Sequence, residues 1–217
     1  MRADFIKYRD FFEQETASEL ILLLRENGIE YEIEEYRDGI APVYHDHILG
    51  NVTTVKLRKE DFPKVDDLLA AQATEALTDI DPNHYLFSFT NEELFEIISK
   101  PDEWSAFDYQ LTKNILRKRG VMVDDAMLSK LKQQRLEQLA EPEPDQSSWV
   151  QAGYLAALAG GLGGIFIGWH LMTFKKVLPN GDRVYGYRKH DRTHGRWIFW
   201  VGMIVFPVAF YLKFFRS

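Results

Sequence analysis

The sequence of 217 residues contains no cysteine. Disulfide bonds, thiol catalysis, CxxC redox pairs and cysteine-ligated zinc are therefore excluded. A cleavable signal peptide is not expected either, because residues 1–10 are charged and no apolar core follows them. The absence of cysteine excludes thiol-based redox proteins and disulfide-dependent proteins. The distribution of charge is the next informative feature.

Acidic residues are scarce in the C-terminal third. Residues 149–217 contain nine Lys or Arg but only Asp182 and Asp191, which gives this part a net charge of +7. Residues 1–148 carry 17 basic and 31 acidic residues, a net charge of −14, so the whole-chain value of −7 combines two unlike parts. An acidic body joined to a basic, aromatic-rich tail favours contact with a membrane or a polyanion.

Charged residues are missing altogether from a run of 26 residues, 149–174. A helix of about 20 apolar residues crosses the roughly 30 Å of bilayer hydrocarbon, so this run predicts a transmembrane helix. A second apolar run, 197–212, is shorter, but the phenylalanines that follow Lys213 extend it to residue 215. The two runs predict a C-terminal transmembrane helical hairpin with the lipid bilayer as a partner. The alternative is a re-entrant path for 149–174.

Small residues recur at every fourth position of the first run. They are Ala152, Ala156, Gly160, Gly164 and Gly168. This spacing lets helix backbones approach closely inside a membrane, where apolar surface alone gives no driving force for association. We therefore expect helix packing at these five positions, against the second run or in a homo-oligomer. The other interpretation is that glycine is simply frequent in membrane helices.

The segment between the two runs, 175–196, is basic. It holds seven Lys or Arg together with His190 and His194, and Asn180-Gly181 predicts the turn of a β-hairpin. Its charge indicates attraction to anionic lipid or a topology signal. A nucleic-acid reader would need interleaved stacking aromatics, and the segment offers only two tyrosines, so we expect no nucleic-acid partner.

The orientation of the chain in a membrane meets a conflict. The basic loop favours the cytoplasmic face, which in a simple hairpin would place the acidic N-terminal part outside, although no export signal is expected for it. A re-entrant first run would place both on one side, since non-helical backbone is tolerated where protein buries it. We expect an integral protein of the inner, cytoplasmic membrane with a cytoplasmic N-terminal domain.

The first 89 residues alternate between strand-like and helix-like patterns. Apolar residues at a period of two predict strands, and the helical period of 3.6 with a glycine stop predicts helices. In order, the segments are strand 5–12, helix 16–26, strand 29–36, strand 52–57, helix 60–77 and strand 85–89. This βαββαβ order is that of a ferredoxin-like sandwich in the α+β class.

Several residues of this region resemble a known family. Ala17-x-x-Leu20 on the first helix, Gly28-Ile29, the alternating strand and the Val-Lys-Leu of 55–57 are similar to a family of PII-like prokaryotic signal-transducing domains. The resemblance covers about residues 4–75. It implies a ligand-sensing or partner-binding module without established activity, and it implies that 37–51 is the effector loop.

The loop 37–51 contains the only His-x-His motif, at His45 and His47. On an extended segment both imidazoles lie on one side and could bind a divalent metal, with Asp46 or His84 as a third ligand. The interpretation we favour is two partly exposed histidines in a polar loop, so we expect no metal site and no cofactor.

Residues 90–140 predict three polar helices, and Thr90 with Glu93 has the spacing of a capping box. The expected organisation is an αβ domain at 1–89, a helical region at 90–140, a linker at 141–148, the first apolar run at 149–174, the basic loop at 175–196 and the second run at 197–215.

Residues that carry catalysis are not grouped anywhere. The apolar runs 149–174 and 197–212 contain no Ser, Asp, Glu, Lys or Arg, and no Ser–His–Asp order or phosphate loop occurs elsewhere. We therefore expect no enzyme and no catalytic residue. The sequence favours a membrane-anchored regulatory or adaptor protein whose αβ domain binds a ligand or protein partner. The alternative is a structural scaffold subunit of a membrane complex.

Overall fold

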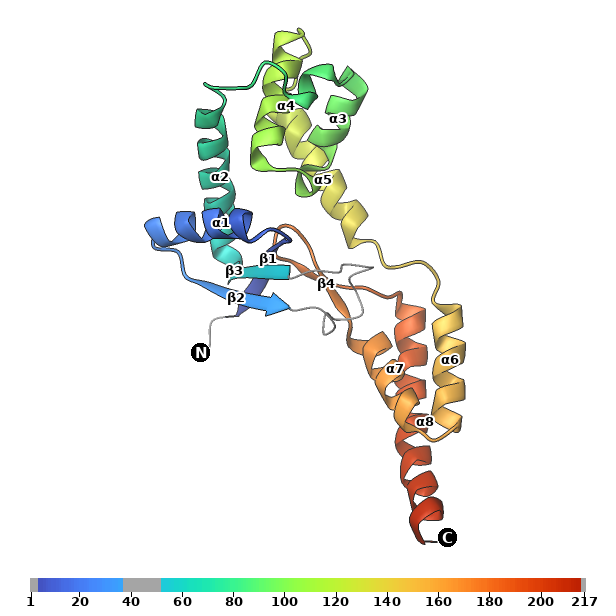
Figure 1. Cartoon of the computed structure of the whole chain (residues 1–217). Helices are drawn as coiled ribbons and strands as arrows, with labels where there is room; N and C mark the ends of the chain where they lie inside the picture. The colour runs from blue at the N-terminus through green and yellow to red at the C-terminus, as the bar shows by residue number, and fades with distance from the viewer. Residues whose placement is uncertain (1–3, 37–51, 216–217) are drawn as a thin grey trace. The chain divides into compact units, whose positions relative to one another are not determined.

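The computed structural model describes residues 4–36 and 52–215 (Figure 1). The chain divides into two compact units. The first comprises Met1–Gln138 with Val177–Asp182, and the second comprises Leu139–Lys176 with Arg183–Ser217. Among the described residues, buried apolar side chains form two clusters in the first unit and one in the second.

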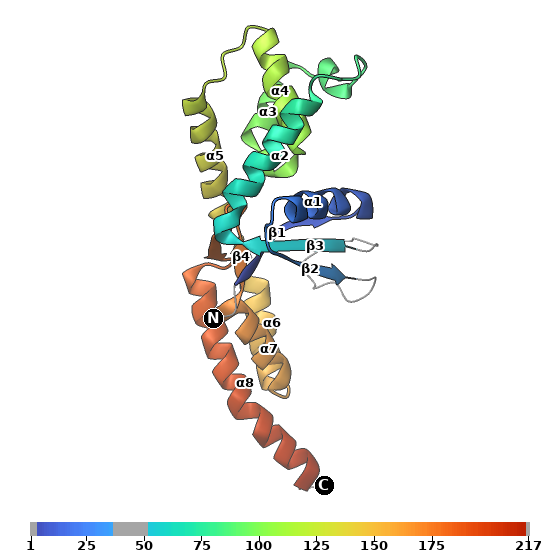
Figure 2. The same ribbon diagram turned by 90° about the vertical axis from the view of Figure 1, so that its left-hand side faces the viewer.

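The first unit begins with a three-stranded antiparallel sheet. Strands β1 (Phe5–Phe11) and β2 (Tyr31–Tyr36) both pair with β3 (Val52–Arg58), which gives the order β1-β3-β2. Helix α1 (Gln14–Glu26) lies along one face of this sheet (Figure 2). A short 3₁₀ turn, η1 (Lys59–Asp61), leads into helix α2 (Phe62–Ala76).

Apolar residues from the sheet and from both helices form one core. Leu24 of α1, Val55 and Leu57 of β3, and Phe62 and Val65 of α2 are almost completely buried in it. The alternate positions of the strands are polar: Lys56 pairs with Glu34 across β3 and β2, and Thr54 donates a hydrogen bond to Asp10 of β1 at 2.7 Å. The sheet therefore has one apolar face and one charged face, as an antiparallel sheet covered on one side requires.

The predicted fourth strand does not form, so the ferredoxin-like sandwich was the wrong fold class. Tyr85–Ser88 is a 3₁₀ helix, η2, whose Leu86 is completely buried in a second apolar cluster. The His84 side chain accepts a hydrogen bond from the Leu86 N–H and so favours the turn over a strand. A five-residue apolar run does not by itself distinguish a strand from a buried turn, and here tertiary packing decided.

Helices fill the rest of the first unit. They are α3 (Asn91–Ser99), the 3₁₀ turn η3 (Pro101–Glu103), α4 (Ala106–Lys118) and α5 (Asp125–Ala140). The predicted capping box is confirmed, because Thr90 accepts from the Glu93 N–H while Glu93 accepts from the Thr90 N–H. Arg135 of α5 forms two hydrogen bonds to Asp102 of η3, at 2.9 and 2.8 Å.

The second unit contains three apolar helices. They are α6 (Ser147–Leu158), α7 (Leu162–Thr173) and α8 (Lys189–Phe215). Strands β4 (Lys175–Val177) and β5 (Arg183–Tyr185) form a hairpin between α7 and α8, with Gly181 at φ +79° in its turn. The tip of this hairpin belongs to the first unit, where Asp182 pairs with Lys59.

The predicted hairpin of two membrane-spanning helices was also wrong. The run 149–174 breaks into α6 and α7 at Gly161, whose φ of +85° is a left-handed conformation that a helix cannot contain. Among the described residues, α8 is the one helix long and apolar enough to cross a membrane. The length of the uncharged run predicted one continuous helix, but the adjacent glycines Gly160 and Gly161 divide the run into two helices.

Candidate functional site

Glycines bring α7 and α8 into close contact. A Cβ added to Gly168 would lie 2.6 Å from the carbonyl oxygen of Gly195, and one added to Gly161 would lie 2.6 Å from that of Gly202. The two glycines of each helix are seven residues apart, so these contacts are two successive levels of one antiparallel interface. No side chain larger than hydrogen fits at either level.

The five small residues predicted to pack have different positions in the structure. Gly168 contacts α8, and Gly164 lies directly against Ala157 of α6. Ala156 is half-buried, with Gly163 opposite it. Ala152 is exposed, and Gly160 lies in the α6–α7 turn, with nothing within 4 Å of a Cβ built on it.

The partner glycines on α8 were missed by the sequence analysis. Gly195 and Gly202 were not singled out, since Gly195 stands in the basic loop and Gly202 in the aromatic second run, and neither belongs to the four-residue repeat of the first run. Their seven-residue spacing places both on one face of a helix, and this was the available signal.

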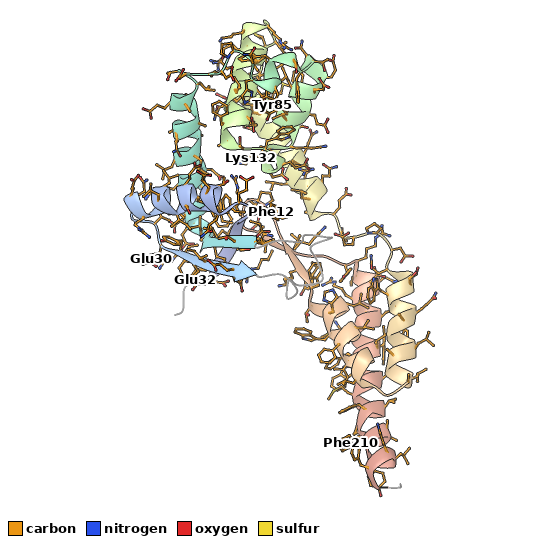
Figure 3. All side chains as sticks on the ribbon, in the orientation of Figure 1. Phe12, Glu30, Glu32, Tyr85, Lys132 and Phe210 are labelled. Atoms are coloured by element: carbon orange, nitrogen blue, oxygen red, sulfur yellow. The ribbon has the colours of Figure 1, made fainter. Side chains whose placement is uncertain are left out.

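Large apolar side chains cover the outer surface of α6, α7 and α8. Of the most hydrophobic 18-residue stretch of α8, only 11% is buried. Exposed apolar residues of the three helices include Trp149, Leu155, Leu158, Leu162, Phe166, Trp169, Trp197, Trp200, Ile204, Val208, Phe210, Leu212 and Phe214. Figure 3 labels Phe210 on the part of α8 that extends past α6 and α7. Soluble monomers rarely expose an apolar surface of this extent, so the surface indicates an apolar environment.

Polar side chains gather at the loop end of the three helices. The Tyr154 hydroxyl of α6 lies 3.1 Å from Nδ1 of His194 on α8, and Nε2 of His194 lies 3.3 Å from Nε2 of His190. His170 of α7 lies 2.9 Å from the Tyr187 hydroxyl. The helices are thus joined by glycine contacts along their length and by histidine–tyrosine pairs at this end.

The basic loop is also organised by specific contacts. The Arg192 guanidinium stacks 3.7 Å above the Tyr185 ring, and the Lys175 ammonium lies 5.0 Å from the same ring. Lys176 donates a hydrogen bond to the Glu141 carbonyl at 2.6 Å. The linker before α6 is therefore attached to the loop, while Lys175 and other basic groups remain exposed to solvent.

The candidate ligands in the αβ domain are not brought together. His45, His47 and Asp46 lie outside the described residues, and His84 belongs to the helical part of the first unit, 3.9 Å from Asp108. Across the described ranges, no three His, Asp or Glu side chains are grouped as a metal site. In the αβ domain, the pKa of Tyr8 departs most from its ordinary value. Burial and a 2.7 Å hydrogen bond to Asp66 raise this pKa.

No protein-family model, curated protein or solved structure matches this chain.

Proposed function

We propose that this chain is a membrane-anchored, non-catalytic adaptor or regulatory protein. Helix α8 crosses the bilayer once, and α6 with α7 enters the bilayer and returns to the same side as a re-entrant pair. The observation that carries the proposal is the exposed apolar surface of α8, of which Ile204 is 66% and Phe214 is 63% exposed. Burying such residues in hydrocarbon removes an unfavourable contact with water.

The lengths of the helices support this path. Helices α6 and α7 have 12 residues each, and α8 has 27. At 1.5 Å per residue these are about 18 Å and about 40 Å long, against the roughly 30 Å of hydrocarbon. Neither α6 nor α7 can cross alone. The turn between them packs Gly161 against the backbone of α8, as re-entrant backbone inside a membrane requires.

A re-entrant pair also removes the conflict over orientation. The first unit and the basic loop then lie on the same side of the membrane, and the loop satisfies the preference of Lys and Arg for the cytoplasmic face. Three tryptophans support placing the loop end of the helices at the membrane–water interface. Trp149 near the start of α6, Trp169 near the end of α7 and Trp197 on the loop half of α8 are all exposed at the loop end.

Acidic substitutions on α8 test the anchor. A charged residue at the centre of a membrane helix costs about 3 kcal/mol, so Ile204→Asp combined with Phe210→Asp should release much of the protein from membranes. The measurement is the fraction of full-length protein that resists alkaline extraction. Met122→Asp is the control, since Met122 is 87% exposed but belongs to the first unit. Retention of the double variant at the wild-type level would refute the anchor.

The binding role of the αβ domain rests on the resemblance of residues 4–75 to signal-transducing domains. Deleting 37–51 from the full-length protein separates this role from a purely structural one. An adaptor or sensor should stay in the membrane and keep its oligomeric state but lose its ligand-dependent or partner-dependent behaviour. A scaffold subunit should instead lose assembly of its complex, which native gels of gently solubilised membranes would detect.

A further inference from the structure

The histidine pair at the loop end of α8 has no part in the anchor described above. His190 and His194 are four residues apart on the first turns of α8, so their side chains lie one above the other on one face. Their Nε2 atoms approach to 3.3 Å, and these are the atoms by which histidine most often binds a metal.

We propose that His190 and His194 form a site for a divalent transition metal of the zinc type. Two nitrogens bound at about 2.05 Å to a tetrahedral metal lie about 3.3 Å apart, whereas a right-angled geometry would need about 2.9 Å. The 3.3 Å separation therefore matches the nitrogen–nitrogen distance expected at a tetrahedral zinc ion. The two remaining positions would be taken by water, since no third protein ligand is grouped with the pair among the described residues.

The outer ring nitrogen of His194 is hydrogen-bonded, as is usual for a metal-binding histidine. His194 Nδ1 lies 3.1 Å from the Tyr154 hydroxyl, so its N–H can donate there while Nε2 stays free to bind metal. His190 Nδ1 lies 3.7 Å from an oxygen of Asp191. The hydrogen bond to Tyr154 favours the His194 tautomer that presents Nε2 to a metal, whereas His190 has only this longer contact with Asp191.

Asp191 places a buried carboxylate next to His190 in the sequence. Its side chain is only 2% exposed, and its Oδ2 atom has no hydrogen-bond partner. A buried carboxylate oxygen without a partner is costly, and a divalent ion held by the neighbouring His190 would lower that cost. The exposed Arg188, Lys189 and Arg196 oppose a dication, so we expect weaker binding than at a three-ligand zinc site.

Zinc titration of the untagged full-length protein in detergent tests the site, with calorimetry as the readout. The wild type should bind one zinc ion. His190→Ala and His194→Ala should each abolish this binding or weaken it more than Tyr154→Phe does. Loss of the outer hydrogen bond in Tyr154→Phe should weaken binding roughly tenfold. The control is the double variant His45→Ala with His47→Ala, which should bind as the wild type does.

A second measurement keeps the test valid if a histidine variant fails to fold. X-ray absorption of the zinc-loaded His45→Ala, His47→Ala protein should show two imidazole nitrogens in the first shell. Absence of zinc binding by the wild type would mean that the 3.3 Å contact is only a hydrogen bond between the rings, and would overturn the site. Binding that survives both His190→Ala and His194→Ala, or that disappears with His45 and His47, would overturn it equally.

Discussion

Gly168 of α7 and Gly195 of α8 face each other at a separation that leaves no room for a side chain. A Cβ on Gly168 would lie 2.5 Å from the backbone nitrogen of Phe199, and one on Gly195 would lie 2.7 Å from the Cβ of Leu171. The clash at Gly168 is with backbone, which cannot move aside as the end of a flexible side chain can. Single glycines therefore determine how closely the apolar helices pack.

We expect Gly168→Leu to destabilise the second unit, because overpacking of a close contact costs about 1–3 kcal/mol. The measurement is the thermal unfolding of the full-length protein in detergent. Ala152→Leu is the matched control, since Ala152 belongs to the same small-residue repeat but is exposed. Equal melting temperatures for Gly168→Leu and wild type would show that the α7–α8 contact is not tight in solution.

At the scale of secondary-structure elements, an ion pair attaches α5 to η3. Arg135 forms two hydrogen bonds to the Asp102 carboxylate and also pairs with Glu103. Burial by itself would raise the pKa of Asp102, but the hydrogen bonds and charge of Arg135 outweigh it, so this pKa lies below its ordinary value of 3.8.

This ion pair predicts a pH dependence of stability. A carboxyl group whose pKa is lowered by folding contributes stability that is fully present above its unfolded pKa and lost as the pH falls through the folded pKa. Asp102→Asn should therefore be less stable than wild type near neutral pH, and the difference should shrink below about pH 3.8. Urea unfolding of the full-length protein at several pH values measures this, with exposed Asp79→Asn as the control. A difference independent of pH would contradict the account.

The sequence allowed some elements to be predicted and not others, for physical reasons. Helices α1 and α2 and the strands of the first sheet follow from apolar periodicity, and the start of α3 follows from the Thr90–Glu93 capping box. Residues 85–89 were wrongly predicted as a strand, because a short apolar run suits both a strand and a buried turn. The break at Gly161 was hidden by the length of the uncharged run, although its paired glycines were visible.

The candidate sites were harder to predict than the elements. The four-residue repeat identified Gly164 and Gly168 as contact positions but not the residues they contact, Ala157 of α6 and Gly195 of α8, because an interface between helices depends on both sequences and on their register. The His190–His194 contact depends on side-chain rotamers, which composition and spacing do not determine.

At the scale of the whole molecule, the division of charge agrees with the division into units. The acidic part of the sequence falls mainly in the first unit, and the basic, apolar part falls mainly in the second unit. We propose that α8 alone crosses the membrane. It follows from this claim that the first unit and residues around Lys175 lie on one side and that Lys213 lies on the other.

The absence of cysteine allows a direct measurement of this arrangement. Single cysteines at Glu75 in α2, Lys175 in β4 and Lys213 near the end of α8 can be labelled with a membrane-impermeant maleimide in intact cells and in inverted vesicles. We predict that Glu75→Cys and Lys175→Cys label only in inverted vesicles and that Lys213→Cys labels in intact cells. Labelling of Glu75→Cys and Lys175→Cys from opposite faces would contradict the single crossing and the re-entrant pair.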